Sequence, residues 1–327
     1  MIKVSIAGWG SAAPEQILAN AEVGARVDRT DEWIVERTGI RERRIATSTE
    51  STATLAVDAA RIAIERAGLA PEQIDLMLIA TCTPEQPIPH TGAFVGDALG
   101  LKCGSFDLNA ACSGFVYGMV AGASMVAGGG IGNVLVIGAE TFSRILNYDD
   151  RGTCVLFGDG AGAAVLVPST NDDGGILAWD AGCDGSTAWF VGINAGGSRL
   201  PASPESVAAG EHYLKMVGKE VFNFAVPAIV KSVSATLDQA GVELTDVDWV
   251  IPHQANARMV EAAMRELGVP PERVVLNIER YGNTSAASIP LALAEAADDG
   301  RFKPGDLVMF PSVGAGMTWA TLLFRWS

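Results

Sequence analysis

The chain has 327 residues, of which 49% are hydrophobic and only 19% are charged. This composition excludes intrinsic disorder and indicates much buried surface, and the length suits two domains or one large duplicated domain. The formal net charge of −15 argues against nucleic acid as a partner.

The first half of the chain reads as alternating helices and buried strands. An amphipathic helix is predicted over 54–67, and the apolar run that follows it reads as a strand ending near Thr81. A strand-like run beginning at Ser105 then turns into a small-residue helix at Cys112, and 132–138 reads as another strand buried on both faces. Alternating elements of this kind indicate an α/β fold.

The second half repeats the first at a constant offset of 173 residues. Segment 67–80 matches 240–252, where a helix predicted over 227–240 again precedes a strand, and 132–138 matches 305–311. Two matches at one offset indicate an ancient duplication. We therefore expect two halves, residues 1–170 carrying the cysteine and residues 171–327 carrying the histidine and asparagine described next, joined by the polar stretch 169–175.

Cys112 lies where the strand-like run turns into the helix. The positive end of a helix dipole favours the thiolate, which is the form of cysteine that attacks acyl groups. Downstream, His253 ends a predicted strand, and Asn283 lies in a turn that the 173-residue offset makes equivalent to the Cys112 corner. Because functional groups at the carboxyl ends of strands can converge on one cleft, these three residues predict an acyl-transfer site.

The remaining cysteines, and two other patterns, have plainer interpretations. Five widely spaced cysteines without a CxxC pair, and only three histidines, argue against a structural zinc site and favour reduced thiols in the cytoplasm. The four cysteines other than Cys112 are interpreted as core residues, and 41–44 as a solvated charged loop. Segment 158–163 formally fits a dinucleotide-binding pattern, but the strand predicted over 163–167 excludes the helix that such a site needs.

The apolar run at the beginning of the sequence is too short for a signal peptide, and no apolar stretch reaches 18 residues. We therefore expect a cytoplasmic protein that does not enter a membrane.

The order of six motifs along the chain resembles the β-ketoacyl-acyl carrier protein synthase III family. The motifs are 31–44 (DEWIVERTGIRERR), the Cys112 segment, DRGT at 150–153 with FGDGAG at 157–162, PHQAN at 252–256, GNTSAA at 282–287 and GAGMTW at 314–319. The resemblance covers essentially the whole chain. It implies a thiolase-like αβαβα five-layer fold built from two duplicated halves, usually as a homodimer.

The resemblance also implies the chemistry. Cys112 would take an acyl group from acyl-coenzyme A, and His253 and Asn283 would stabilise the enolate formed when malonyl-acyl carrier protein loses carbon dioxide. Backbone N–H groups of Cys112 and Gly316 would form the oxyanion hole, where glycine lets the backbone come close. Acyl-coenzyme A is a substrate here, and neither a metal nor a cofactor is expected.

Further positions match the family's binding residues. Trp33, Arg37 and Arg151 would hold the coenzyme A nucleotide, since a guanidinium pairs with phosphate and stacks on adenine. Arg258 and Arg265 would form a basic patch for an acidic carrier protein, although Glu266 weakens that patch. Lys219 departs from the neutral residue expected beside the pantetheine tunnel.

Ile88 has two interpretations. It matches a family residue that closes the acyl pocket of the partner subunit, where its small size would admit a medium or branched acyl chain. Flanked by Pro87 and Pro89, it is equally interpreted as a loop residue that packs on the dimer surface.

Three rival functions remain open at this point. The first is an acyltransferase or priming ketosynthase of a polyketide or other secondary-metabolite pathway, which would use the same three residues. The second is a degradative thiolase, which is disfavoured because residues 314–318 contain no second cysteine. The third is a non-catalytic subunit that binds a carrier protein, which is disfavoured by the presence of Cys112, His253 and Asn283 together.

Overall fold

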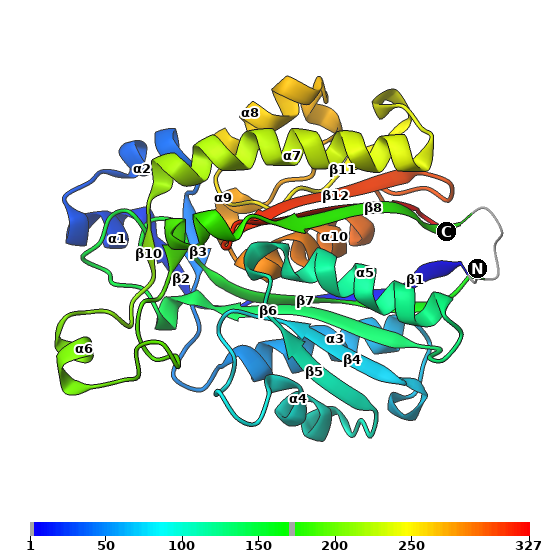
Figure 1. Ribbon diagram of the computed structural model, residues 1–327, viewed down its shortest axis with the longest axis horizontal. Coiled ribbons are helices and arrows are strands. Elements are labelled where there is room, and N and C mark those ends of the chain that lie inside the picture. Colours follow the sequence, from blue (N-terminus) through cyan, green and yellow to red (C-terminus); the bar gives the residue numbers. More distant parts are fainter. Residues whose placement is uncertain (1–2, 170–173) are drawn as a thin grey trace.

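The structure, a computed structural model, describes residues 3–169 and 174–327. Two mixed β-sheets lie face to face with helices between them and on both outer faces (Figure 1). From bottom to top in Figure 1, the layers are helices, first sheet, helices, second sheet and helices. The five-layer αβαβα arrangement implied by the sequence is therefore confirmed.

The first sheet has strand order β1-β7-β6-β4-β5. Its strands are β1 (Val4–Ala12), β7 (Asp159–Pro168), β6 (Val134–Thr141), β4 (Leu76–Ala80) and β5 (Gly104–Leu108). The second sheet has the order β8-β13-β12-β11. Its strands are β8 (Gly175–Cys183), β13 (Thr318–Arg325), β12 (Leu307–Gly314) and β11 (Trp249–Val250). An isolated parallel bridge from Val250 to Val274 extends the second sheet where β5 extends the first.

The central layer consists of α5 (Gly114–Ala127) and α10 (Ser288–Asp298). These helices are apolar on several sides, because one continuous core joins them to both sheets. The outer layers are α3 (Thr52–Arg66) with α4 (Thr91–Leu99) below, and α7 (Gly218–Ala240) with α8 (Ala257–Leu267) above (Figure 1).

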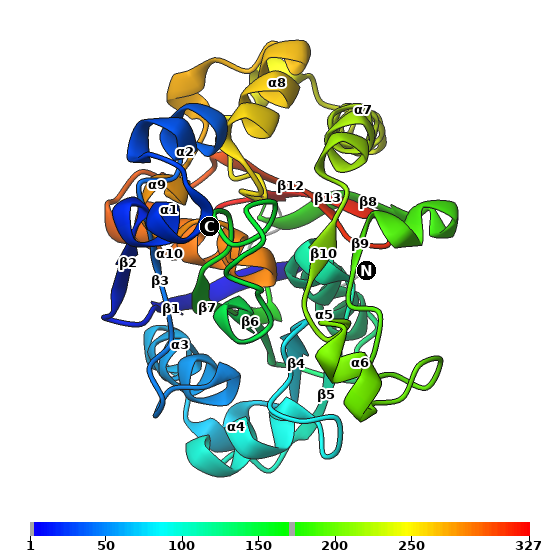
Figure 2. The same cartoon turned by 90° about the vertical axis from the view of Figure 1, so that its left-hand side faces the viewer.

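Smaller elements cover the end of the sandwich that faces the viewer in Figure 2. The helices are α1 (Asn20–Val27), α2 (Asp31–Thr38), α6 (Pro204–Ala208) and α9 (Ile278–Tyr281). The short strands are β2 (Ile17–Ala19) paired with β3 (Glu42–Arg44), and β9 (Val191–Gly192) paired with β10 (Lys215–Met216).

The duplication predicted from the sequence appears in the geometry of the two sheets. Strands β4 and β6 correspond to β11 and β12 at the predicted offset of 173 residues. The two strand-to-helix corners correspond at 174 instead, because the short turns 111–113 and 285–287 precede α5 and α10 in the same way. Ala111 and Ser285 share a left-handed backbone, with φ of 50° and 49°. Cys112 therefore corresponds to Ala286 and not to residue 285.

Two other expectations about local structure are wrong. The helix predicted over 227–240 begins at Gly218, and Pro227 lies inside it. The charged run 41–44 is not a solvated loop, because it forms β3 and the Arg43 side chain is completely buried. Arg43 donates hydrogen bonds to Asn20 Oδ1 at 2.8 Å and to the Val155 carbonyl at 2.7 Å, which compensate its burial. Burial lowers its pKa to about 10.

The boundary proposed between residues 170 and 171 lies outside the described residues, as do residues 170–173 of the expected joint. That division stays a prediction. Among residues 3–169 and 174–327, no helix is both long and apolar enough to cross a bilayer.

Candidate active site

A pocket of about 750 Å³ opens between the two halves, at the carboxyl ends of strands from both sheets. Cys112, His253, Asn283 and Gly316 all line it, so the structure brings the predicted nucleophile, its two partners and the oxyanion-hole glycine together. A volume of this size suits an organic ligand. Of the strands of the first sheet, the parallel β4, β5 and β6 all end toward this pocket.

Cys112 sits in the turn 111–113 between β5 and α5. Ala111 takes the left-handed conformation that reverses the chain just before it. The end of β12 packs directly on this turn at Gly314, where a Cβ atom would lie 2.7 Å from the Cys112 nitrogen and 2.9 Å from the Ser113 nitrogen. Glycine at 314 therefore permits the contact between the two halves at the nucleophile, a role that sequence reasoning missed.

The Cys112 thiol lies partly open to the pocket but is surrounded by protein. Its pKa is raised to about 12, mainly by burial and to a smaller extent by the Glu140 charge, although the Ser285 hydroxyl lowers it. The expectation that the helix start favours the thiolate is therefore wrong, because loss of hydration outweighs the helix dipole. A proton acceptor has to accompany any attack by this thiol.

Gly316 has a φ of 129°, a conformation that residues other than glycine rarely adopt. A Cβ there would also lie 3.1 Å from Thr318 Cγ2, which is a tight contact. The same loop is held by reciprocal backbone hydrogen bonds between Asp184 and Met317, at 2.9 and 3.1 Å.

His253 is fixed at the end of the strand that begins with β11. Its backbone N–H donates to the Pro311 carbonyl at 2.8 Å, which continues the ladder with β12 beyond β11. Its Nδ1 shares a hydrogen bond of 2.7 Å with Ser288 Oγ, and its Nε2 is buried without a partner. Burial lowers the pKa of the imidazole to about 3, so the ring is neutral at physiological pH.

Asn283 is held by residues just before β7. Its backbone N–H donates to the Leu156 carbonyl at 2.8 Å, and its carbonyl accepts from the Gly158 N–H at 3.0 Å. The Asn283 Oδ1 accepts a hydrogen bond of 2.8 Å from the Ser285 N–H. This bond orients the carboxamide, because it leaves the Nδ2 donor for the pocket.

Glu140 is a buried carboxyl group behind the pocket lining that sequence reasoning also missed. It is the next-to-last residue of the apolar strand β6 and has no exposed surface. The Thr83 hydroxyl donates to it at 2.7 Å, and the backbone N–H groups of Cys82 and Thr83 donate at 3.0 to 3.2 Å. Burial raises its pKa to about 7 despite these bonds. A glutamate within a run of apolar strand residues is the signal that would have identified it.

None of the predicted nucleotide-binding residues lines the pocket, but α2, which carries two of them, is linked to its lining. Trp33 and Arg37 stack on α2, with the guanidinium 4.5 Å from the ring centroid. The Arg37 carbonyl accepts a hydrogen bond of 3.0 Å from Nδ2 of Asn256, which itself lines the pocket. Arg151 is exposed on the turn before β7, and residues 154–157 of that segment share a hydrophobic cluster with Ile34 of α2.

Four other residues singled out in the sequence lie outside the pocket lining. Arg258 and Arg265 are exposed on α8, together with Glu266. Lys219 is exposed in the first turn of α7, between the pocket-lining residues Gly218 and Val221. Ile88 is 85% exposed and does not line the pocket of its own chain.

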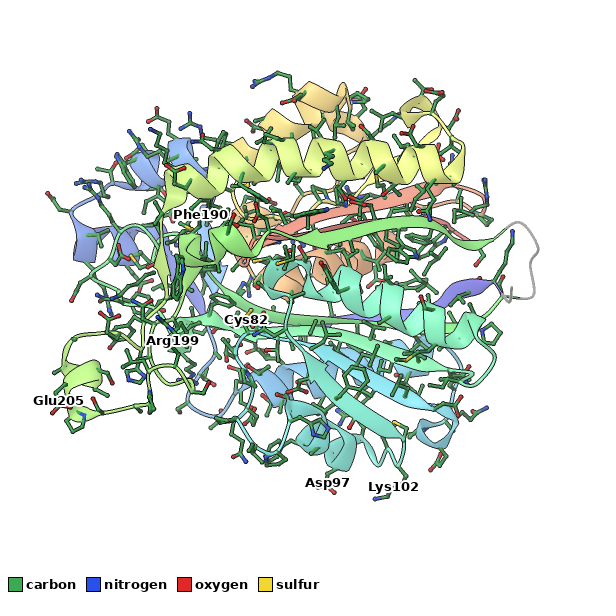
Figure 3. All side chains as sticks on the ribbon, viewed as in Figure 1. Cys82, Asp97, Lys102, Phe190, Arg199 and Glu205 are labelled. Carbon is green, nitrogen blue, oxygen red and sulfur yellow. The ribbon has the colours of Figure 1, made fainter. Side chains whose placement is uncertain are left out.

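The expectation that the other cysteines are core residues holds only in part. Cys154 is buried, but Cys82 and Cys183 both line the pocket, and Cys183 is exposed. Cys82 directly follows β4, at the ends of the first sheet's parallel strands (Figure 3). Cys183 Sγ lies 3.7 Å from the point where a Cβ on Gly316 would be. A second thiol therefore does lie beside the glycine-rich loop, although the sequence of that loop contains none.

Within residues 3–169 and 174–327, no group of three or more His, Cys, Asp or Glu side chains is arranged to hold a metal ion.

Two family models match the chain. Residues 106–185 match 3-oxoacyl-[acyl-carrier-protein (ACP)] synthase III, and residues 237–326 match the C-terminal part of the same enzyme. A β-ketoacyl-[acyl-carrier-protein] synthase III of Symbiobacterium thermophilum is 50% identical, with 99% of this chain and 98% of that protein covered.

Solved structures agree with this match. The 3-oxoacyl-[acyl-carrier-protein] synthase III of Aquifex aeolicus VF5 superposes with a TM-score of 0.91 at 42% identity, covering 99% of this chain and all of that one. The priming β-ketosynthase of the R1128 polyketide biosynthetic pathway superposes with a TM-score of 0.92 at 35% identity, covering 100% and 97%.

Proposed function

The chain belongs to the β-ketoacyl-[acyl-carrier-protein] synthase III family, and from this premise we propose how its own residues perform the reaction. The protein is a condensing acyltransferase that initiates fatty-acid synthesis. We propose that it loads an acyl group from acyl-coenzyme A onto Cys112 and condenses it with malonyl-acyl carrier protein, releasing carbon dioxide and 3-oxoacyl-acyl carrier protein. The observation that carries the proposal is that Cys112, His253, Asn283 and Gly316 line one pocket.

In the first half-reaction, Cys112 Sγ attacks the thioester carbonyl carbon and coenzyme A leaves as its thiolate. The negative charge on the carbonyl oxygen is stabilised by the backbone N–H groups of Cys112 and Gly316. The contact at Gly314 supports this role, because it holds β12 and the Cys112 turn together. Such donors fixed before the reaction stabilise charge at little reorganisation cost.

In the second half-reaction, His253 Nε2 and Asn283 Nδ2 donate hydrogen bonds to the malonyl thioester oxygen as carbon dioxide leaves. The buried, unpartnered Nε2 and the orientation of Asn283 support this role. For Nε2 to donate, Nδ1 has to accept, and Ser288 supplies that hydrogen when its hydroxyl turns from the Ser285 carbonyl to the imidazole.

The acyl chain occupies the apolar limb of the same pocket in this proposal. The lining there consists of Phe142, Ile145, Leu156, Phe157, Val191 and Leu214. The coenzyme A nucleotide lies at the mouth, held by Trp33, Arg37 and Arg151. Support comes from the Trp33–Arg37 stack and its link through Asn256 to the pocket lining.

The carrier protein docks on α8, where Arg258 and Arg265 offer positive charge on an otherwise acidic molecule. The first turn of α8 also lies against Gly39 at the end of α2, so this surface adjoins the pocket mouth. We place the reaction in the cytoplasm, since all five cysteines are free thiols. Two chains form a dimer in this proposal, with Ile88 reaching the partner.

The test is the intact mass of the protein after incubation with a panel of acyl-coenzyme A donors. The expected result is the gain of one acyl group on Cys112 and its loss when malonyl-acyl carrier protein is added. Cys112→Ser should acylate about a thousandfold more slowly or worse, because an alcohol is a far weaker nucleophile. Cys103→Ser is the matched control, because Cys103 does not line the pocket. Equal acylation of the Cys112→Ser protein would contradict the proposal.

A further inference from the structure

Ser285 lines the pocket, and two features of its conformation and surroundings are energetically unfavourable. Its φ of 49° lies in the left-handed region, which residues other than glycine rarely adopt. Its hydroxyl is completely buried and has no hydrogen-bond partner. Residues held in this way cluster at functional sites.

The other half of the molecule shows that the turn itself does not need a hydroxyl. Ala111 occupies the equivalent corner with φ of 50°, and the same short turn and helix follow it. A methyl group is therefore sufficient for the backbone geometry. The hydroxyl of Ser285 calls for another explanation.

The turn that carries Ser285 packs against both the turn of Cys112 and the strand β6 of Glu140. The Ser285 side chain lowers the pKa of the Cys112 thiol and that of Glu140. At Gly138 of β6 a Cβ would come within 2.2 Å of the Ala286 carbonyl oxygen.

We propose that Ser285 and Glu140 form a proton relay that activates Cys112. This inference rests on the proposed role of Cys112 as the acyl acceptor. In this relay Ser285 receives the proton of the reacting sulfur, and Glu140 acts through Ser285.

The relay balances over the two half-reactions. As Cys112 Sγ attacks the acyl carbon, its proton passes to Ser285 Oγ while the hydroxyl proton of Ser285 passes to the Glu140 carboxylate. Coenzyme A leaves as its thiolate and is protonated by water at the pocket mouth. When condensation releases the Cys112 thiolate, the proton returns from Glu140 by the same route. Glu140 therefore holds the proton for the lifetime of the acyl-enzyme.

Electrostatics favours this route over transfer to His253. Moving the proton from Cys112 to Glu140 leaves the buried cluster with the same total charge. Moving it to the buried imidazole would create two opposite charges in a desolvated pocket, which is costly. His253 is also the weaker proton acceptor, because burial lowers its pKa to about 3, whereas burial raises the pKa of Glu140 to about 7.

The groups around Glu140 leave it suited to this task. The titratable groups that face it are the Cys82 thiol, from the turn after β4, and the Cys112 thiol, from the turn after β5. The hydroxyls of Thr81 and Thr83 donate to it, at 3.3 and 2.7 Å. These neutral donors stabilise the anion while leaving it able to take a proton.

The test is the rate of alkylation of Cys112 by iodoacetamide between pH 5 and 10, followed by intact and peptide mass in the full-length protein. In the unmodified protein the rate should rise through a midpoint near pH 7 and then level off, because Glu140 has to be ionised. Ser285→Ala, which copies Ala111, should remove the plateau. Its rate should be at least tenfold lower at pH 7 and should climb steadily up to pH 10. Glu140→Gln should give the same profile.

Ser232→Ala is the matched control, since Ser232 in α7 is likewise buried with an unpartnered hydroxyl but lies outside the pocket lining. It should leave the profile unchanged. If Ser285→Ala only scales the rate by one factor at every pH, its role is structural and the relay is wrong, whether or not Glu140→Gln folds. Failure of the unmodified protein to gain an acyl group at Cys112 would instead contradict the proposed function itself.

Discussion

At the scale of single residues, the proposed mechanism assigns different groups to the two half-reactions. One pair stabilises the negative charge formed during acyl transfer, and another pair stabilises the charge formed during the later decarboxylation. In the proposed mechanism, Cys112 and Gly316 act on the acyl thioester, whereas His253 and Asn283 donate hydrogen bonds to the second substrate. Each of the latter two side chains is held at one end by a hydrogen bond, to Ser288 and to the Ser285 N–H, so that its other end faces the pocket.

His253→Ala and Asn283→Ala should therefore separate the two half-reactions. We expect acylation of Cys112 to change by only a few fold, and decarboxylation of malonyl-acyl carrier protein to fall by about 100-fold or more, as for the loss of an oxyanion donor. Radiolabelled carbon dioxide release measures the second step and acyl-enzyme mass the first. A parallel loss in both steps would show that these side chains serve the nucleophile.

Burial of the His253 imidazole should also make the free energy of unfolding depend on pH. Its folded-state pKa of about 3 lies below the ordinary 6.5, so the unfolded chain binds a proton that the folded protein refuses between these pH values. Stability is then lost as the pH falls through this window, by about 1.4 kcal/mol per pH unit. Urea unfolding of the unmodified protein and of His253→Gln at pH 7, 6, 5 and 4 should show curves that converge on acidification.

The contribution of Glu140 to the free energy of unfolding should depend on pH with the opposite sign. Its folded-state pKa of about 7 lies above the ordinary 4.5, so its stability contribution is lost as the pH rises between these values. Between pH 4.5 and 6.5 the two slopes offset each other in the unmodified protein. Glu140→Gln, unfolded in the same series, should therefore lose stability more steeply on acidification than the unmodified protein. Parallel curves for both variants would contradict the assigned protonation states.

At the scale of elements, the active site is a meeting of two strand-to-helix corners and one strand end. The corners carry Cys112 and Ser285, and the strand end is Gly314 of β12. Their contacts are made between backbones. Adding even a single methyl group where they meet should therefore displace one of these segments.

Gly314→Ala tests this arrangement. The new Cβ would lie 2.7 Å from the Cys112 nitrogen, so β12 or the Cys112 turn has to shift. We expect a loss of about 1–3 kcal/mol in the free energy of unfolding, as for overpacked cores, and an acylation rate at least tenfold lower. Gly104→Ala in strand β5 is the control, because its Cβ would meet only Leu76 Cδ1 at 3.7 Å. Equal effects of the two substitutions would argue against a special role for Gly314.

Helix α2 offers a second test at this scale, since its Trp33–Arg37 stack lies beside the pocket mouth. Arg37→Ala and Arg151→Ala should raise the KM for acyl-coenzyme A by about 10- to 100-fold, the equivalent of one charge-assisted hydrogen bond. The KM for the same acyl group on N-acetylcysteamine, which lacks the nucleotide, should stay within twofold. Equal changes for both donors would place these arginines outside the nucleotide site.

The elements also show what the sequence predicts and where it stops. Strand β6 and its counterpart β12 follow the predicted repeat, because strands buried on both faces are unbroken apolar runs. The early start of α7 was missed because its first turns mix polar and apolar residues, and because Pro227 suggests a boundary. The burial of Arg43 was not predicted, because its hydrogen-bond partners, Asn20 and the Val155 carbonyl, are distant in sequence. The candidate site was predicted as a set of residues, but the Ser285–Glu140 pair depends on a contact between the halves that no spacing reveals.

At the scale of the whole molecule, the Ile88 side chain is exposed to solvent in a single chain. The residue is 85% exposed on the loop between β4 and α4, although it is large and apolar. The proposed dimer gives it a partner, the acyl pocket of the second chain.

Ile88→Phe should therefore change which acyl-coenzyme A donors are used. A larger ring in the partner's pocket should shift preference toward acetyl-coenzyme A by about 1–3 kcal/mol, the range for discrimination between single methylene groups. The kcat/KM values for a series of acyl lengths measure the shift, and sedimentation measures the dimer. An unchanged chain-length profile in a dimeric variant would show that another residue closes the pocket.

The packing of Gly314 on the Cys112 turn also sets an order of events during protein synthesis. Cys112 leaves the ribosome about 200 residues before Gly316, which at typical elongation rates is roughly 10 to 40 s earlier. Throughout that interval the nascent chain carries the thiol without the glycine loop, and for about the first 140 residues it also lacks His253. We therefore expect that an unfinished chain does not turn over coenzyme A thioesters until β12 and β13 have been made and inserted into the second sheet.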